Sequence, residues 1–186
     1  MIGFALCGSF CTISEALVQM QELAKHYEVQ GIISENVAAT DTRFGKASDT
    51  VAYVQKVTKR PVIRSVLAAE PLGPKTPLEA LVICPCTGNT LAKMANGITD
   101  TAVTMAAKAH LRSDRPLVIA LASNDALSAN LKNIAALLSR KNVYFVPMKQ
   151  DDPQKKPHSL VADFSLLPQA LRAALSGKQL QQLFLV

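Results

Sequence analysis

The stretch LVICPCTGNTLAKMANGITD, residues 81–100, contains the change of pattern that decides the fold. Its first four residues form a continuous apolar run, which is typical of a strand buried on both faces of a parallel sheet. A turn of small and hydroxyl residues follows, and a helix is expected over residues 88–112 with a break near Gly97. Strand, polar turn and helix in this order predict one βα unit of an α/β protein.

The same alternation continues on both sides of this unit. Strands are expected at residues 2–7, 29–33, 62–63, 117–122 and 143–146, and helices at 13–24, 49–59, 127–139 and 166–175. The sequence therefore predicts a three-layer α/β fold with a doubly wound parallel sheet, flavodoxin-like or Rossmann-like, in a single domain of residues 1–186.

The remaining segments are predicted to be irregular or exposed. Residues 34–48 are polar, and residues 70–77 contain three prolines, so both are expected to be loops. Residues from about 148 to 160 are predicted to form an exposed excursion. Gly177 is placed to end the last helix, and the apolar end of the tail, residues 178–186, is expected to pack on the body or on a neighbouring subunit.

Composition and charge exclude several classes of protein. The chain is 49% hydrophobic and 18% charged with a formal net charge of +6, but its Lys and Arg residues form no dense tract and no aromatic residues alternate with them. This pattern argues against a nucleic-acid partner and indicates a general preference for anionic ligands. No apolar stretch reaches the roughly 18 residues that span a membrane, and no basic residue precedes the first apolar run, so a cytoplasmic protein is expected.

Two loops are the candidate ligand site: CGSFCT, residues 7–12, and PCTGNT, residues 85–90. In a doubly wound sheet these loops meet at the carboxyl edge, where free N–H groups at helix starts attract anions. A short Gly-Ser turn suits one phosphate, and the sequence contains neither G-x-x-x-x-G-K-[ST] nor G-x-G-x-x-G. The alternative is that Ser9, Thr87 and Thr90 are only helix caps.

The stretch PCTGNTLAKMANGITD, residues 85–100, resembles the P-[AL]-[ST]-A-N-T-x-A-K-x-A-N-G-x-x-D signature of the FMN-binding flavoprotein family. That family includes phosphopantothenoylcysteine decarboxylase, related cysteine decarboxylases and flavin prenyltransferases. The resemblance implies bound FMN and a homo-oligomer of three or more copies. Carried over residue by residue, it implies cofactor contacts at Gly8, Ser9, Ser34, Phe44, Thr87, Gly88 and Asn89. The family usually has alanine where this chain has Gly88, which alters the pocket wall.

Further motifs resemble one branch of that family. They are TDTRFG at 40–45, AEPLGPK at 69–75, SNDAL at 123–127 and QDDPQKKPHSLVA at 150–162. The branch comprises flavoprotein-like subunits of two-subunit enzymes that oxidise a dihydro- or tetrahydrodipicolinate precursor to pyridine-2,6-dicarboxylate during sporulation. This resemblance implies a dinucleotide-binding, dehydrogenase-like partner chain, NAD(P) bound through that partner, and a location in the mother cell.

A dicarboxylate substrate needs cations or backbone donors. Arg43 is the best candidate because arginine makes forked contacts with carboxylates, and Lys93 and Asn124 are further candidates. The alternative is that these are solvated surface side chains. No pair of carboxylates suggests an acid–base couple, so no catalytic residue is assigned.

The chain departs from the decarboxylases of the family. The histidine that they use before the fourth predicted strand is absent, and the histidines present are His26, His110 and His158. Of the P-x-M-N-x-x-M stretch only Asn124 remains. Cysteine decarboxylation is therefore not expected, and a non-catalytic partner chain with a vestigial flavin or phosphate pocket stays open beside the redox function.

The four cysteines are expected to be free thiols. Cys7, Cys11, Cys84 and Cys86 have no standard zinc spacing. Cys7 and Cys84 lie in strand runs and should point into the core, where cysteine behaves as a small hydrophobe. No metal site is therefore predicted.

Overall fold

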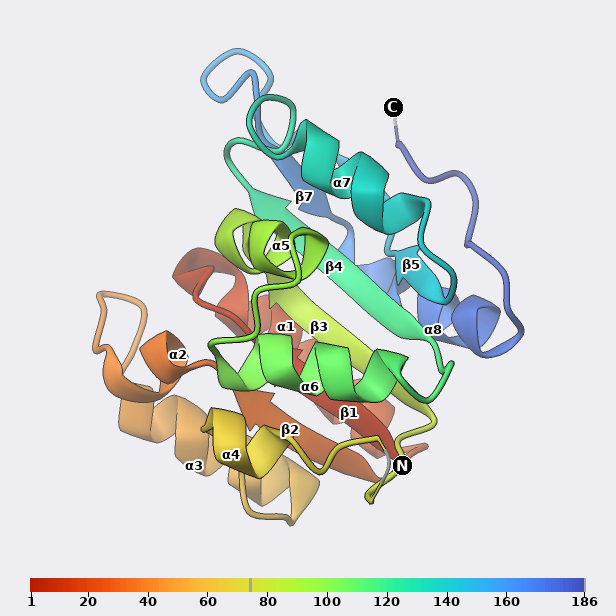
Figure 1. Ribbon diagram of the computed structural model, residues 1–186. Coiled ribbons are helices and arrows are strands. Elements are labelled where there is room, and N and C mark those ends of the chain that lie inside the picture. Colours follow the sequence, from red (N-terminus) through yellow and green to blue (C-terminus); the bar gives the residue numbers. More distant parts are fainter. Residues whose placement is uncertain (74, 186) are drawn as a thin grey trace.

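The computed structural model describes residues 1–73 and 75–185, and a mostly parallel β-sheet forms its centre (Figure 1). The parallel strands are β1 (Ile2–Leu6), β2 (Val29–Ile33), β3 (Ala80–Cys86), β4 (Leu117–Ser123) and β5 (Val143–Phe145). Their spatial order is β2-β1-β3-β4-β5, with β5 paired to β4. The chain thus runs outward in both directions from β1 and β3, which confirms the predicted doubly wound sheet.

Helices cover both faces of this sheet (Figure 1). One face carries α1 (Ile13–Ala24), α3 (Ala47–Thr58) and α8 (Leu167–Leu175), and the other carries α4 (Val66–Ala69), α5 (Gly88–Ala95), α6 (Ala102–Leu111) and α7 (Leu131–Leu138). Every residue of β1, β3 and β4 is buried as a result. Their continuous apolar sequences follow from this double burial, because neither face of such a strand meets water.

The sheet is not purely parallel. Strands β6 (Met148–Lys149) and β7 (Leu160–Ala162) form an antiparallel pair, and β7 runs antiparallel to the end of β4. Residues 149–158 of the predicted excursion are exposed or half-buried, whereas Met148 and Leu160 at its two ends are buried in the short strands. The sequence did not predict β6 and β7, because two- and three-residue strands are too short to show a periodic pattern.

Three sequence-based boundaries need correction. Residues 62–63 do not form a strand: Ile63 makes a single bridge to Ile32 beside β2. The predicted loop over 34–48 contains a short helix, α2 (Glu35–Ala39). The helix predicted from residue 127 begins at Leu131 instead, since the backbone N–H of Asn130 bonds the carbonyl of Asp125 in a preceding turn.

Other expectations about loops and ends are confirmed. Helices α5 and α6 are separate, and Gly97 has a φ of +73° at the predicted break. The tail packs on the body, because Met148 exchanges backbone hydrogen bonds with Leu183 and Leu185. Pro74, in the predicted loop 70–77, and Val186 lie outside the described residues. No helix in the described ranges is long and apolar enough to cross a membrane.

Candidate functional site

A cavity of about 360 Å³ opens at the carboxyl ends of β1, β2 and β3. Its lining comes from the turns after these strands and from the start of α6. The lining residues are Gly8, Phe10, Ser34, Glu35, Asn36, Thr87, Asn89, Thr90, Lys93, Asp100 and Thr101. The loops after β1 and β3 therefore meet where the strand order reverses, as the sequence predicts.

The turn after β1 holds Ser9 in a defined position beside this cavity. The Ser9 Oγ accepts a 3.0 Å hydrogen bond from Thr12 Oγ1, and its backbone N–H donates to the carbonyl of Cys7. Within the described residues, the Ser9 hydroxyl caps no backbone N–H of the helical turn that follows. The helix-cap alternative is therefore wrong for Ser9, and its hydroxyl donates to none of the described residues.

Ser34 and Thr87 do act as helix caps. Thr87 Oγ1 accepts from the backbone N–H of Thr90 at 3.2 Å, and Ser34 Oγ accepts from that of Val37 at 3.5 Å. Both hydroxyls also line the cavity. They fix the starts of α5 and α2, so two helix N-termini and their unpaired N–H groups point to the same edge.

Gly88 faces away from the cavity, toward a polar cluster formed by Ser123, Asp125 and Asn130. A Cβ added at Gly88 would lie 2.7 Å from Asn130 Nδ2 and 2.8 Å from Asp125 Oδ1, and closer still to Ser123 Oγ. The position must therefore be glycine because three side chains approach its Cα. Gly88 is not among the described residues that line the cavity, and its contact with a cofactor stays a prediction.

The polar cluster behind Gly88 was not predicted from the sequence. Ser123 Oγ and Asn130 Nδ2 donate to the two carboxylate oxygens of Asp125, the latter at 2.9 Å. Asn133 in turn donates to Asn130 at 2.8 Å. The bond from Ser123, followed by that from Asn130, holds the pKa of Asp125 below its usual value. The cluster ties the loop after β4 to the start of α7 and packs against Gly88 at the start of α5.

Lys93 and Asn89 are brought to the cavity by α5. Lys93 Nζ forms an ion pair with Asp100 at 2.9 Å, and its side chain is 22% exposed. The hydrogen bond from Lys93 holds the pKa of Asp100 below its usual value. Asn89, in the first turn of α5, is exposed and thus accessible to a ligand.

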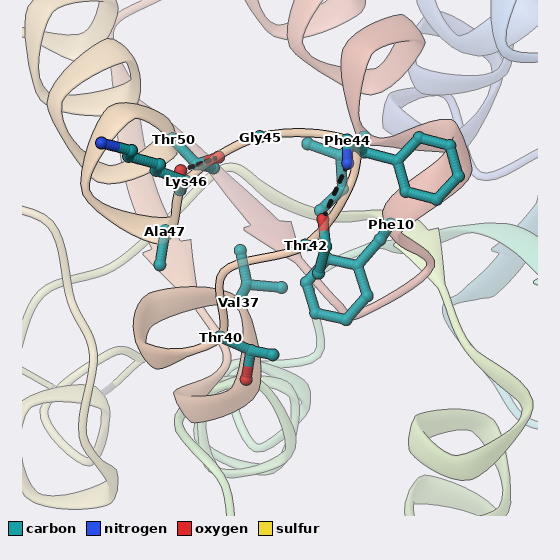
Figure 2. Close-up of a pocket in the computed structure, with 10 residues that line it drawn as sticks. Phe10, Val37, Thr40, Thr42, Phe44, Gly45, Lys46, Ala47 and Thr50 are labelled. Carbon is teal, nitrogen blue, oxygen red and sulfur yellow. Dashed lines mark hydrogen bonds between the residues drawn. The ribbon is translucent and has the colours of Figure 1, made fainter.

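Arg43 and Phe44 lie at the tip of a loop beside the cavity. The loop closes on itself, since Thr42 and Gly45 exchange backbone hydrogen bonds, and Arg43 stacks over the Phe44 ring at 4.8 Å. Phe44 lines only a separate hollow of about 20 Å³, room for roughly one water molecule. Figure 2 shows the Phe10 ring beside Thr42 in this hollow, whereas the Phe44 ring points outward.

The larger cavity and this hollow share one residue, Phe10, which the sequence-based reasoning missed. Within the described ranges, Arg43, Phe44 and Asn124 are absent from the lining of the 360 Å³ cavity, and Asn124 is exposed after β4. Glu35 is a second missed residue, because its carboxylate accepts from the backbone N–H of Ala102 at the start of α6. A carboxylate directly after a strand was its only sequence signal.

The thiols behave as the sequence predicts. Cys7, Cys84 and Cys86 are buried, and Cys11 is exposed. Burial raises the pKa of Cys7 to about 11 and raises that of the other two buried thiols well above the usual value. Across residues 1–73 and 75–185, no group of three or more histidine, cysteine or acidic side chains is placed to hold a metal ion.

The histidines lie away from the cavity. His110 is fully buried in α6, where its Nε2 lies 2.9 Å from the carbonyl of Pro116. Burial is the main cause that lowers the pKa of His110. His26 and His158 are exposed, at the end of α1 and in the tip of the β6–β7 excursion. The three therefore occupy packing or surface positions.

A doubly wound sheet with hydroxyl-rich turns after β1 and β3 defines a flavodoxin-like class of protein, in which the site for a ligand lies at the carboxyl edge of the sheet. The sequence profile of the Flavoprotein family matches residues 1–164. The chain belongs to the Flavoprotein family.

Two relatives are similar over nearly the whole chain. The dipicolinate synthase B subunit of Bacillus subtilis strain 168 is 47% identical over 181 residues, which cover 97% of this chain and 90% of the relative. The crystal structure of the dipicolinate synthase B subunit from Bacillus halodurans C is 45% identical with a TM-score of 0.91, covering 100% of this chain and 95% of that one. These matches confirm the resemblance that the motifs indicated.

More distant structures share the fold. The FMN-dependent cysteine decarboxylase SpaF is 23% identical with a TM-score of 0.65, and the match covers 93% of this chain and 95% of SpaF. At this level of identity the similarity confirms the flavodoxin-like fold and carries no statement about activity.

Proposed function

We propose that this chain is the flavoprotein-like B subunit of a dipicolinate synthase. In this proposal it holds FMN in the 360 Å³ cavity and takes part in oxidising a dihydro- or tetrahydrodipicolinate precursor to pyridine-2,6-dicarboxylate. Its partner is the dehydrogenase-like A subunit of dipicolinate synthase, which brings NAD(P), in the cytoplasm of the sporulating mother cell. The main support is the cavity between the turns after β1 and β3. It occurs in a chain that is 45–47% identical to two dipicolinate synthase B subunits over nearly its full length.

The groups around the cavity fit a ligand with one phosphate. The donors are hydroxyls, the two amides of Asn36 and Asn89 and helix N-termini, and the one cation among the described lining residues, Lys93, is already paired with Asp100. Neutral donors of this kind suit a phosphate monoester better than a pyrophosphate, whose larger charge calls for more cations. Ser9, Ser34 and Asn89 would donate to the phosphate, because the Ser9 and Ser34 hydroxyls only accept hydrogen bonds from the described residues, whereas the Thr87 hydroxyl donates to Thr90 Oγ1 at 3.1 Å. A volume of about 360 Å³ lies in the usual range for cofactor sites.

When bound, FMN would supply the acceptor for a hydride or for electrons. The protein's own part is to orient that group and the substrate. Arg43 lies in the loop beside the cavity, stacked on Phe44, and is proposed to bind a substrate carboxylate. If this is its role, Arg43→Ala raises the KM of the reconstituted two-subunit enzyme, with Lys46→Ala on the same loop as the control. An unchanged KM would remove Arg43 from the site.

One observation favours a second candidate, a non-catalytic chain with a vestigial pocket. Two carboxylates, Glu35 and Asp100, line the cavity, and negative charge opposes a phosphate. Each has a partner, however: Glu35 accepts from the backbone of Ala102, and Asp100 is paired with Lys93. This compensation is why we place the flavin-binding function first.

The visible absorption spectrum of the purified chain, before and after FMN is added and dialysed away, separates these two functions. Retained flavin bands support the proposal, whereas a colourless chain that cannot be loaded supports the vestigial pocket. Ser9→Ala is expected to weaken FMN binding about tenfold or more, because a hydrogen bond to a charged group contributes about 1.5–3 kcal/mol. The control is Ser139→Ala, whose exposed hydroxyl bonds only the carbonyl of Ala136 in α7. Equal affinities for both variants would exclude Ser9 from the phosphate site.

The homo-oligomer of three or more copies, implied by the family resemblance, is part of the proposal. So is the single domain of residues 1–186, which the one continuous core of buried side chains supports.

A further inference from the structure

A second cavity, of about 240 Å³, is lined mainly by residues of α5, α6, α7 and β4. These three helices lie on the same face of the sheet (Figure 1). Apolar side chains from four elements form its wall, among them Met94, Ala107 and Leu137, which are buried. Ile98 stands at its edge and is 47% exposed. The space could accept one or two large apolar side chains.

Two cations border this apolar groove. Lys108 of α6 and Arg140 after α7 belong to its lining, and both are exposed. In the described part of the chain neither forms an ion pair, and no acidic side chain lines the groove. An apolar centre with an unpaired cationic rim is complementary to an apolar anchor flanked by carboxylates.

The groove shares a wall with the candidate FMN site. Gly97, Ile98 and Thr99 line the groove, and the next two residues, Asp100 and Thr101, line the 360 Å³ cavity. Two residues of this segment, Ile98 and Asp100, bond Lys93 of α5. The backbone N–H of Ile98 donates to the carbonyl of Lys93 at 2.8 Å, and the Lys93 ammonium pairs with Asp100. A group that moves Ile98 therefore acts directly on a wall of the flavin site.

We propose that this groove is where the dehydrogenase-like partner docks, by inserting an apolar side chain that is flanked by carboxylates. The proposal rests on the proposed function, which supplies that partner. A second copy of this chain fits the groove less well. The chain carries a net charge of +6, so a second copy would bring a like charge to the cationic rim of Lys108 and Arg140. Docking here places the partner against the 97–101 segment, so FMN and the partner influence each other's affinity by the same factor.

The test measures the affinity of the purified dehydrogenase-like partner for the full chain by isothermal titration calorimetry. Lys108→Glu/Arg140→Glu is compared with Lys56→Glu/Lys132→Glu, which changes the net charge equally at exposed positions on α3 and on α7 outside the groove. We expect the groove variant to bind at least tenfold more weakly and the control to bind within about twofold of the wild type. Ile98→Asp, at an exposed position, should weaken binding to a similar extent without unfolding the chain.

Three results would overturn the proposal. Equal affinities of the two double variants show that the partner docks elsewhere. A change in the oligomeric state of the groove variant alone, with affinity for the partner retained, shows that a second copy occupies the groove. A wild-type chain that does not bind the partner removes both this proposal and the partner assigned under the proposed function. FMN loading of the same variants tests the flavin proposal independently of the docking proposal. A chain that binds no FMN but still binds the partner through the groove would contradict FMN binding and leave the docking site supported.

Discussion

Gly88→Ala tests whether the polar cluster behind α5 leaves any room for a side chain. The backbone at Gly88 has no positive φ, so alanine is conformationally allowed, and helix propensity would favour it by at most about 1 kcal/mol. The contacts oppose it, because the new Cβ would lie 2.8 Å from Asp125 Oδ1 and nearer to Ser123 Oγ. Overpacking costs about 1–3 kcal/mol, and displacing the Ser123–Asp125 hydrogen bond adds about 1–3 kcal/mol.

The sum of these terms predicts a loss of about 3 kcal/mol in the free energy of unfolding, or ~6–12 °C in Tm. Urea unfolding followed by circular dichroism measures it. Gly8→Ala is the matched control, since a Cβ there would lie 3.4 Å from the Phe10 ring and 4.0 Å from Asn36 Cβ, both ordinary contacts, and should cost under about 1 kcal/mol. In a Ser123→Ala background the Gly88→Ala cost should fall by about 1 kcal/mol, because the nearest atom is gone. A cost no larger than that of Gly8→Ala, or one unchanged by Ser123→Ala, would refute the steric argument.

Two further predictions concern titratable groups. Iodoacetamide at pH 8 should alkylate the folded chain at Cys11 alone, since burial blocks the other three thiols and raises the pKa of Cys7 to about 11; a second adduct in the mass spectrum of the native protein would contradict this. Burial lowers the pKa of His110, so the unfolded chain binds the proton first as pH falls. The contribution of His110 to the free energy of unfolding is therefore complete above about pH 6.5 and declines below it. Between pH 7 and 5, the free energy of unfolding measured in urea should fall less steeply for His110→Gln than for the wild type.

The sequence was sufficient to predict the architecture. Continuous apolar runs indicate strands buried on both faces, and helical spacing of apolar residues indicates amphipathic helices. Both patterns involve only residues close together in the sequence, so they can be recognised without any knowledge of tertiary contacts. The same holds for the site's location, because topology alone brings the ends of β1 and β3 together. Of the predicted site residues, Gly8, Ser34, Thr87, Asn89 and Lys93 line the cavity, and Ser9 lies beside it.

Only the tertiary structure decided what several of these residues touch. Gly88 sits in the same turn as Thr87, yet it serves a cluster built from residues 123–130, and no local pattern encodes that approach. The antiparallel β6–β7 pair and the groove between α6 and α7 have the same origin. Each depends on how elements distant in the chain are set against one another, whereas hydrophobic periodicity records only whether each element has a buried side.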